Sequence, residues 1–337
     1  MTATHATQLL RPEQIAVQAL EQIPYLHLPE HGSVFADREM RLRQLAAGHA
    51  MGDYLRFVAE VARAQQQLLH RYPAVPLPTL QQIDAAAQAA EPLLPAASWI
   101  RDAGWQQGLA QLLDELLARV RDVQAGVTMR KLLGMPADAI ELQADRLLNG
   151  VMVGLDLGTA PLIGAALQTY WTHLVLATAA TAGKGAAPFG RTVNATLCPC
   201  CGSRPTASVT RIGPETTGLR YLHCSLCSTQ WHMVRIKCTC CETTKGIAYQ
   251  SLEPIDGRAK SASNAKNDAV QAEICDQCGH YLKVVHMEKD TQVEPVADDL
   301  ATVTLDLLVT ETGRQRHGVN LMLLFGDSDP APSPGAA

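Results

Sequence analysis

Four Cys-x-x-Cys pairs lie within an 81-residue stretch of this 337-residue chain, and no cysteine lies outside that stretch. Both sulfurs of such a turn point toward one position, so two turns can supply the four thiolates of a tetrahedral metal site. The four turns therefore predict two metal ions, each in a four-cysteine centre. The eight predicted ligands are Cys198, Cys201, Cys224, Cys227, Cys238, Cys241, Cys275 and Cys278.

Disulfides and thioredoxin-like redox pairs are the alternatives to metal sites. Disulfides need an oxidising compartment, and Met1 to Leu10 lack both the basic start and the apolar core of a secretory signal. The apolar stretch from Val151 to Gly183 is broken by glycine and proline and contains several polar side chains, which favours a buried helix over membrane insertion. We therefore expect a cytoplasmic protein with reduced, metal-bound cysteines.

The apolar pattern changes at a segment rich in Gly, Ala and Pro. Before it, apolar residues recur at helical spacing, as in Asp53 to His70, Trp105 to Val123 and Asp138 to Met152. After it, short segments rich in β-branched and aromatic residues lie between turns and predict strands. The predicted fold is α+β: an all-helical N-terminal domain, two tandem rubredoxin-like or zinc-ribbon β modules, and a C-terminal helix. The predicted domains are a helical domain (1–181), a linker (182–190), a first ribbon (191–237), a second ribbon (238–296), a C-terminal helix with a packing segment (297–325) and a disordered tail (326–337).

The order of turns and strands forms an internal repeat. The intervals of 22 residues after Cys201 and 33 residues after Cys241 are each long enough for a hairpin that brings the flanking cysteine turns together. Adjacent pairing then places the first and second turns in one centre and the third and fourth turns in the other. Interleaved pairing, as in a cross-brace, is the alternative.

Two further cysteines and four histidines lie near the predicted centres. Cys200 and Cys240 lie inside Cys-x-x-Cys turns, and we expect them to be small side chains at the turn tips, with alternate ligation as the second reading. With four thiolates already available to each metal, the histidines are expected to support the strands. These histidines are His223, His232, His280 and His286.

The segment from Ala297 to Thr312 predicts a single helix that packs against the body of the protein. Asp298 and Asp299 would lie in its first turn, where the helix dipole favours acidic side chains. Neighbouring residues on a helix point about 100° apart, so this pair does not suggest two carboxylates that share a proton.

The chemistry of the metal sites and the charge of the cysteine-rich region argue against two classes of function, catalysis and nucleic-acid binding. A metal with four thiolate ligands has no open position for substrate, and no known catalytic motif stands out, so we expect no enzyme activity. The residues from Cys198 to Val296 contain eleven basic and ten acidic side chains. Because each four-thiolate zinc would add a charge of −2, this region carries about −3 overall, unlike a nucleic-acid-binding surface. Spacing alone favours zinc but is compatible with iron.

Several runs of the chain closely resemble the formate dehydrogenase accessory protein (FdhE) family. They are the CPxCG pattern at Cys198 to Gly202, GLRYLHCSLCSTQWHMVRIKC from Gly218 to Cys238, CDQCGHYLK from Cys275 to Lys283, and VADDL from Val296 to Leu300. The resemblance is close from about 197 to 308 and weaker in the helical half. Cys200 and Cys240 depart from the family pattern.

The resemblance implies a cytoplasmic factor for the assembly or maturation of active formate dehydrogenase, acting on the catalytic subunit. It also implies that the eight cysteines of the Cys-x-x-Cys turns are the metal ligands, and it favours rubredoxin-like iron as the metal. A rubredoxin-like electron-transfer protein and a zinc-ribbon nucleic-acid-binding protein are the alternative functions. The identity of the metal, its redox role, the partner-binding surface and the oligomeric state are left open by the sequence.

Overall fold

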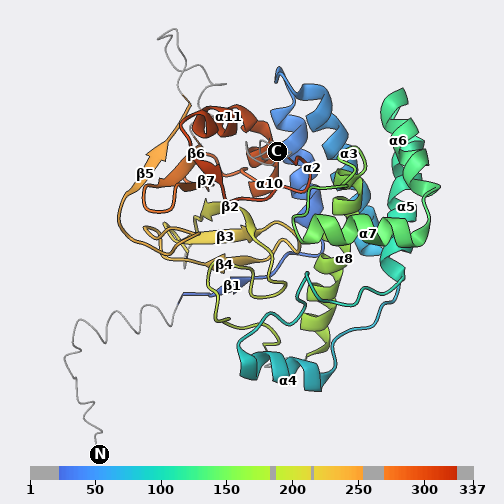
Figure 1. The fold of residues 1–337 in the computed structure, drawn as a ribbon, viewed down its shortest axis with the longest axis horizontal. Helices are drawn as coiled ribbons and strands as arrows, with labels where there is room; N and C mark the ends of the chain where they lie inside the picture. The colour runs from blue at the N-terminus through green and yellow to red at the C-terminus, as the bar shows by residue number, and fades with distance from the viewer. Residues whose placement is uncertain (1–22, 183–186, 214–215, 253–268, 325–337) are drawn as a thin grey trace, which may run out of the picture.

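The computed structural model describes residues 23–182, 187–213, 216–252 and 269–324. In this part of the chain a helical half lies beside a half built around one β-sheet, with α2 and α8 at the boundary between them (Figure 1). The α+β architecture predicted from the sequence is confirmed. The limits of the predicted domains stay predictions, and the predicted tail at 326–337 lies outside the described residues.

The helical half contains long amphipathic helices around a buried one. The apolar face of α3 meets α2, α5 and α8, while α8 is apolar on nearly every side and runs through the middle of the structure (Figure 1). No helix among the described residues is both long and apolar enough to cross a bilayer. The helices are α2 (Val34–Leu45), α3 (Gly52–His70), α4 (Leu80–Ala89), α5 (Gly104–Arg119), α6 (Val123–Leu133), α7 (Ala137–Leu148) and α8 (Ala160–Thr181).

The two predicted β modules form one continuous sheet. Within each module the strands are antiparallel, and the modules join where β2 pairs in parallel with β7, with Ser208 opposite Val284. The order along the sheet is β1-β4-β3-β2-β7-β6-β5, and β8 pairs with β7 outside this path. The strands are β1 (Leu26–His27), β2 (Pro205–Thr210), β3 (Arg220–Cys224), β4 (Gln230–His232), β5 (Ile247–Gln250), β6 (Val270–Cys275), β7 (His280–His286) and β8 (Gln315–Arg316).

The N-terminal part of the chain is not purely helical, because β1 pairs antiparallel with β4 at the edge of the sheet. The pairing places Leu26 opposite Trp231, and the hydroxyl of Tyr221 donates a hydrogen bond of 2.7 Å to the carbonyl of Pro24. This short strand therefore links the start of the described chain to the first cysteine module.

The single helix expected over 297–312 is wrong: the chain forms α10 (Pro295–Ala301) and α11 (Val303–Glu311), separated at Thr302. The buried ammonium of Lys283, on β7, donates hydrogen bonds to the carbonyls of Asp299 and Thr302 at 2.8 and 3.0 Å. A continuous helix would use those carbonyls for its own backbone bonds. The break therefore allows two backbone carbonyls to accept hydrogen bonds from the buried ammonium of Lys283.

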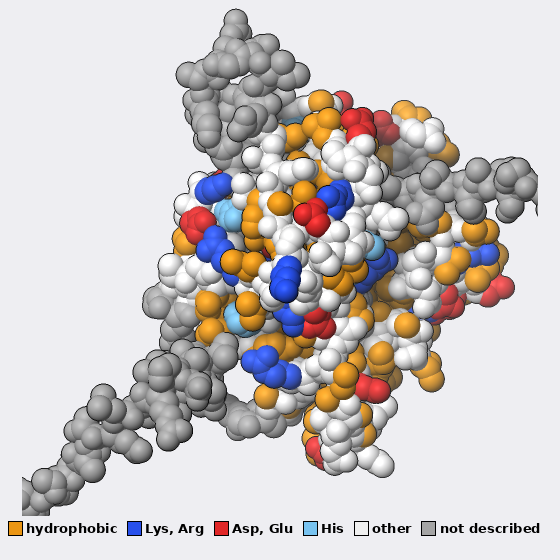
Figure 2. All heavy atoms as spheres, turned by 60° about the vertical axis from the view of Figure 1, so that its left-hand side comes forward, with side chains coloured by type: hydrophobic (Ala, Val, Ile, Leu, Met, Phe, Trp, Pro, Cys, Tyr) orange, Lys and Arg blue, Asp and Glu red, His pale blue; other side chains and the backbone are white. Residues whose placement is uncertain are grey.

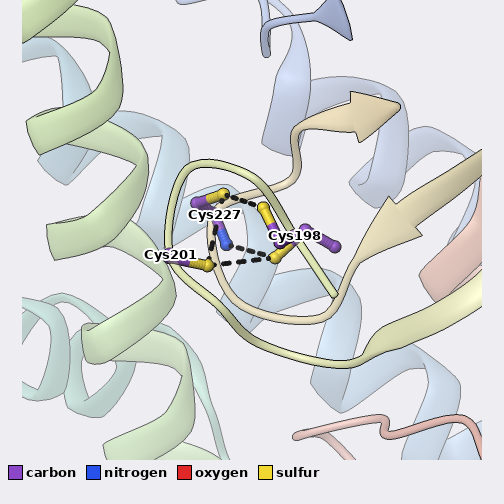
Figure 3. A group of neighbouring side chains, drawn as sticks. Cys198, Cys201 and Cys227 are labelled. Atoms are coloured by element: carbon purple, nitrogen blue, oxygen red, sulfur yellow. Dashed lines mark hydrogen bonds between the residues drawn. The ribbon is translucent and has the colours of Figure 1, made fainter. Parts of the chain in front are cut away.

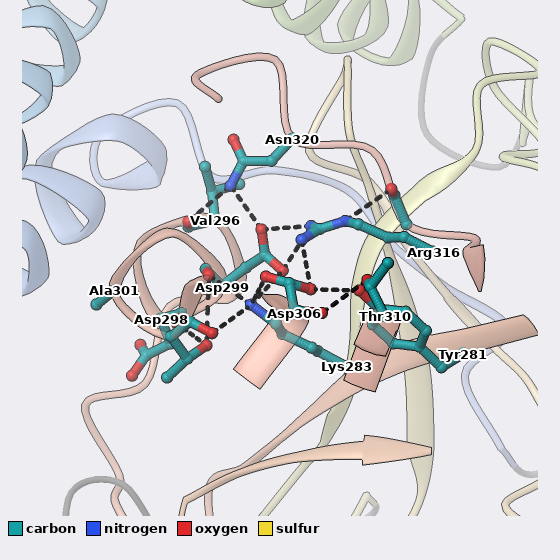
Figure 4. Close-up of polar contacts among 12 residues, drawn as sticks. Tyr281, Lys283, Val296, Asp298, Asp299, Ala301, Asp306, Thr310, Arg316 and Asn320 are labelled. Carbon is teal, nitrogen blue, oxygen red and sulfur yellow. Dashed lines mark hydrogen bonds and ion pairs between the residues drawn. The ribbon is translucent and has the colours of Figure 1, made fainter. Parts of the chain in front are cut away.

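Asp298 lies in the first turn of α10, as predicted, but both adjacent acids of this helix are buried partners in ion pairs. Asp298 pairs with the buried Arg41 of α2 at 2.6 Å, which ties α10 to the helical half. Asp299 faces the other way and contacts Arg316 at 2.7 Å and Lys283 at 3.4 Å (Figure 4). Burial opposes ionisation of Asp299, but these two cations outweigh it and hold the pKa of this carboxyl below its ordinary value.

Candidate metal centres

Each of the four cysteine turns is closed by a residue in the left-handed region directly after its second cysteine. Their φ values are +71° at Gly202, +58° at Ser228, +60° at Glu242 and +72° at Gly279. This conformation reverses the chain so that both sulfurs of a turn face the same side, and glycine adopts it at the lowest cost. The glycines of the first and fourth turns are therefore readable in the sequence, whereas Ser228 and Glu242 give no such signal.

The first centre has the sulfur spacing of a tetrahedral metal site. The Sγ–Sγ distances are 3.5 Å from Cys198 to Cys227, 3.4 Å from Cys201 to Cys224 and 3.7 Å from Cys201 to Cys227 (Figure 3). A metal–sulfur bond of about 2.3 Å in a regular tetrahedron corresponds to about 3.8 Å between sulfurs. The four thiols therefore fit a single zinc-sized ion.

The first centre is enclosed by protein on all sides. Its four cysteines are at most 1% exposed and belong to the same apolar core as the helices. Gln168 of α8 donates to the carbonyl of Ser225 at 2.8 Å, inside the second turn. Burial raises the pKa of the Cys198 and Cys224 thiols, so the charge of a bound metal ion is what would make thiolates favourable at this position.

The second centre has the same spacing but lies at the surface. The Sγ–Sγ distances are 3.7 Å from Cys238 to Cys278 and 3.7 Å from Cys241 to Cys275. Cys238 and Cys275 are buried, Cys278 is half-buried and Cys241 is exposed. The centre lies beside β5, the last strand of the sheet, so fewer protein groups surround it than the first centre.

The structure brings the eight predicted cysteines together in the two sets that adjacent pairing predicts, with the four ligand atoms of each set within 4.8 Å of one another. It does not bring the first and third turns together, as interleaved pairing would require. Metal binding by these cysteines stays a prediction, which the sulfur spacing supports. An ion held by four thiolates would cross-link the turns and have no open position for substrate.

The structure places some of the extra cysteines and histidines beside a cysteine set and others away from both sets. Cys200 is fully buried beside the first centre, with its Sγ 3.6 Å from the Oγ1 of Thr229. Cys240 lies within 4.8 Å of Cys278 and His280, a juxtaposition that sequence reasoning missed. The other histidines lie outside both cysteine sets: His223 contacts Gln230, His232 packs edge-on against Tyr221, and His286 shares a hydrogen bond with Thr210.

We expect the anaerobically purified protein to bind two metal ions per chain, because each cysteine set can hold one. Replacing Cys198 and Cys201 together should remove one ion, and replacing Cys275 and Cys278 together should remove the other. Metal analysis of the purified proteins measures this stoichiometry. A single ion in fully loaded wild-type protein would refute the presence of two sites.

Three models of the FdhE protein family match successive parts of the chain: FdhE N-terminal at 23–186, FdhE central domain at 197–235 and FdhE C-terminal domain at 236–323. The FdhE homolog of Cronobacter sakazakii is 37% identical over 92% of this chain and 94% of its own length. The FdhE homolog of Pseudomonas aeruginosa is 39% identical over 94% of this chain and 98% of its own length. The crystal structure of the FdhE protein from Pseudomonas aeruginosa superposes with a TM-score of 0.78 at 38% identity, covering 90% of this chain and all of that one.

Proposed function

The chain belongs to the FdhE family, and from this premise we propose that it is a cytoplasmic accessory factor for the assembly or maturation of active formate dehydrogenase. In this proposal it binds the catalytic subunit of that enzyme and has no catalytic activity of its own. The observation that carries the proposal is the family match over almost the whole chain, including both cysteine sets.

The position of the first centre supports a structural role for its metal. The carbonyls of Cys200 and Cys201 accept hydrogen bonds of 2.9 and 2.8 Å from the amides of Leu94 and Ala96 in the helical half. The indole of Trp171, on α8, in turn donates to the carbonyl of Leu94 at 3.0 Å. A metal-bound first centre would thus hold the sheet and the helices in one shape that a partner protein can recognise.

A second candidate function is electron transfer by rubredoxin-like iron. The exposure of Cys241 favours it, because electrons could reach the second centre from the surface. Reversible absorbance changes upon reduction of the iron-loaded protein would support this function. Zinc in both centres would argue against it, since zinc has no redox chemistry.

The surface gives little support to nucleic-acid binding. On the face shown in Figure 2, basic and acidic side chains are interspersed with apolar ones and do not form a continuous basic patch. The formal net charge of the whole chain is −5. Binding to phosphate backbones draws instead on clustered lysine and arginine side chains.

We expect the tagged full-length protein to co-purify with the catalytic subunit of formate dehydrogenase from cells that express the enzyme. A variant with serine at Cys224 and Cys227 should lose the subunit, because it loses the metal-stabilised shape. Mass spectrometry of the eluates identifies the subunit and measures its recovery. Sustained formate-dependent dye reduction by the purified chain alone would contradict the accessory role.

A further inference from the structure

The second centre contains a thiol and an imidazole that the four-thiolate set does not use. Cys240, Cys278 and His280 each offer one ligand atom, and these three atoms lie within 4.8 Å of one another. Cys278 belongs to both sets. Among the described residues, no histidine is grouped in this way with the cysteines of the first centre.

Local hydrogen bonds hold this second set in place. The amide of Cys240 donates to the Sγ of Cys238 at 3.3 Å, which fixes the turn that carries the Cys240 thiol. The Nδ1 of His280 lies 2.9 Å from the carbonyl oxygen of Cys278. A carbonyl can only accept, so Nδ1 donates a hydrogen bond to it, and Nε2 is the ring nitrogen left to bind a metal ion. Histidine ligands of metals commonly donate their other ring nitrogen to a carbonyl in this way.

The two halves of the second centre differ in how firmly the protein holds them. The C-terminal segment anchors the Cys275–Cys278 turn. The guanidinium of Arg314 donates to the carbonyl of Cys275 at 3.1 Å, and the amide of Gln315 donates to the carbonyl of Gly279 at 2.9 Å. The opposite turn ends in the exposed Cys241 and Glu242. Cys241 is therefore the ligand that solvent reaches most easily.

We propose that the second centre has two alternative ligand sets that share Cys278. One is the four-thiolate set, and the other consists of Cys240, Cys278 and His280, with one coordination position left to water. Both sets suit a divalent ion such as Zn²⁺ or Co²⁺, which accepts thiolate and imidazole ligands in tetrahedral geometry. A metal ion released by Cys238, Cys241 and Cys275 then stays bound in the second set, and its open position makes this centre the exchangeable one. The first centre keeps its metal enclosed.

Cobalt(II) binding to full-length protein tests the proposal without relying on activity. The triple variant Cys238→Ser, Cys241→Ser, Cys275→Ser keeps only the second set, and it should still bind two Co²⁺ ions per chain under anaerobic conditions. The second ion should show about half the thiolate-to-cobalt absorbance of a four-thiolate site, because two thiolates rather than four bind it. Adding His280→Ala or Cys240→Ser to the triple variant should reduce the stoichiometry to one ion.

Two controls separate loss of a ligand from loss of structure. Adding His232→Ala to the triple variant should leave two ions bound, because His232 lies outside the ligand sets. The unchanged absorbance of cobalt in the first centre reports that each variant is folded. One bound ion in the triple variant would overturn the proposal, as would two ions that stay bound with unchanged absorbance when His280→Ala is added.

Discussion

Replacing Cys224 and Cys227 with serine should abolish cooperative unfolding of the whole protein, whereas replacing Cys275 and Cys278 should leave a native-like transition. The first pair lies in the apolar core that the sheet shares with the helices. Structural zinc contributes about 10–16 kcal/mol of apparent binding free energy, and a folded domain is stable by only about 5–15 kcal/mol. The free energy lost with the first metal ion would therefore be as large as most or all of the protein's free energy of unfolding.

The second pair should have a local effect. A separate apolar cluster, which includes Val270, Tyr281 and Val285 of the sheet and Leu305 of α11, does not contain the cysteines of the second centre. Loss of that metal should disorder the exposed turn and β5 while α10, α11 and the central strands stay folded. We expect the midpoint of thermal unfolding, Tm, to fall by only a few degrees, consistent with a loss of about 1 kcal/mol.

Thermal unfolding followed by circular dichroism, together with metal analysis, compares the two variants. Cys200→Ser is the matched control for the first centre, because Cys200 lies in the same turn as Cys198 and Cys201 but outside the four-cysteine set. It should keep both metal ions and a cooperative transition. An equal fall in Tm for the two double replacements would show that both centres contribute equally to the stability of the fold.

The sequence was most informative where chemistry and local geometry coincide. The Cys-x-x-Cys turns and their hairpin-length intervals predicted which cysteines lie together, because a short interval restricts which turns can meet. The helical spacing in Asp53 to His70 predicted α3 to within a residue. Both signals are local, so no knowledge of distant contacts was needed.

Long-range contacts explain the features that the sequence did not reveal. The parallel pairing of β2 with β7 joins residues that are 76 positions apart, and no local pattern specifies it. Strand β1 is two residues long and has no detectable period. The break at Thr302 depends on Lys283, which lies on a strand earlier in the chain.

The grouping of Cys240 with His280 was missed for a related reason. Cys240 lies in the third turn and His280 is the first residue of β7, 40 positions further along the chain, and only the folded second centre brings them together. Each residue alone is compatible with a turn tip or a strand end. A thiol inside the third turn combined with a histidine two residues after the fourth was the available signal.

The central claim is that the chain is needed to produce active formate dehydrogenase, and the expected effect of its loss is large. A strain that lacks the gene should still synthesise the catalytic subunit but should lose nearly all formate dehydrogenase activity. The wild-type gene and the Cys200→Ser variant should restore activity. The variant with serine at Cys224 and Cys227 should not, because its first centre cannot hold a metal ion.

Formate dehydrogenase activity in extracts of the deletion strain, normalised to the amount of catalytic subunit on an immunoblot, tests this claim most directly. The account predicts normal or near-normal subunit with activity reduced to background, and recovery upon complementation. Wild-type activity per subunit in the deletion strain, with no second copy of the gene, would contradict the maturation role and favour the electron-transfer function.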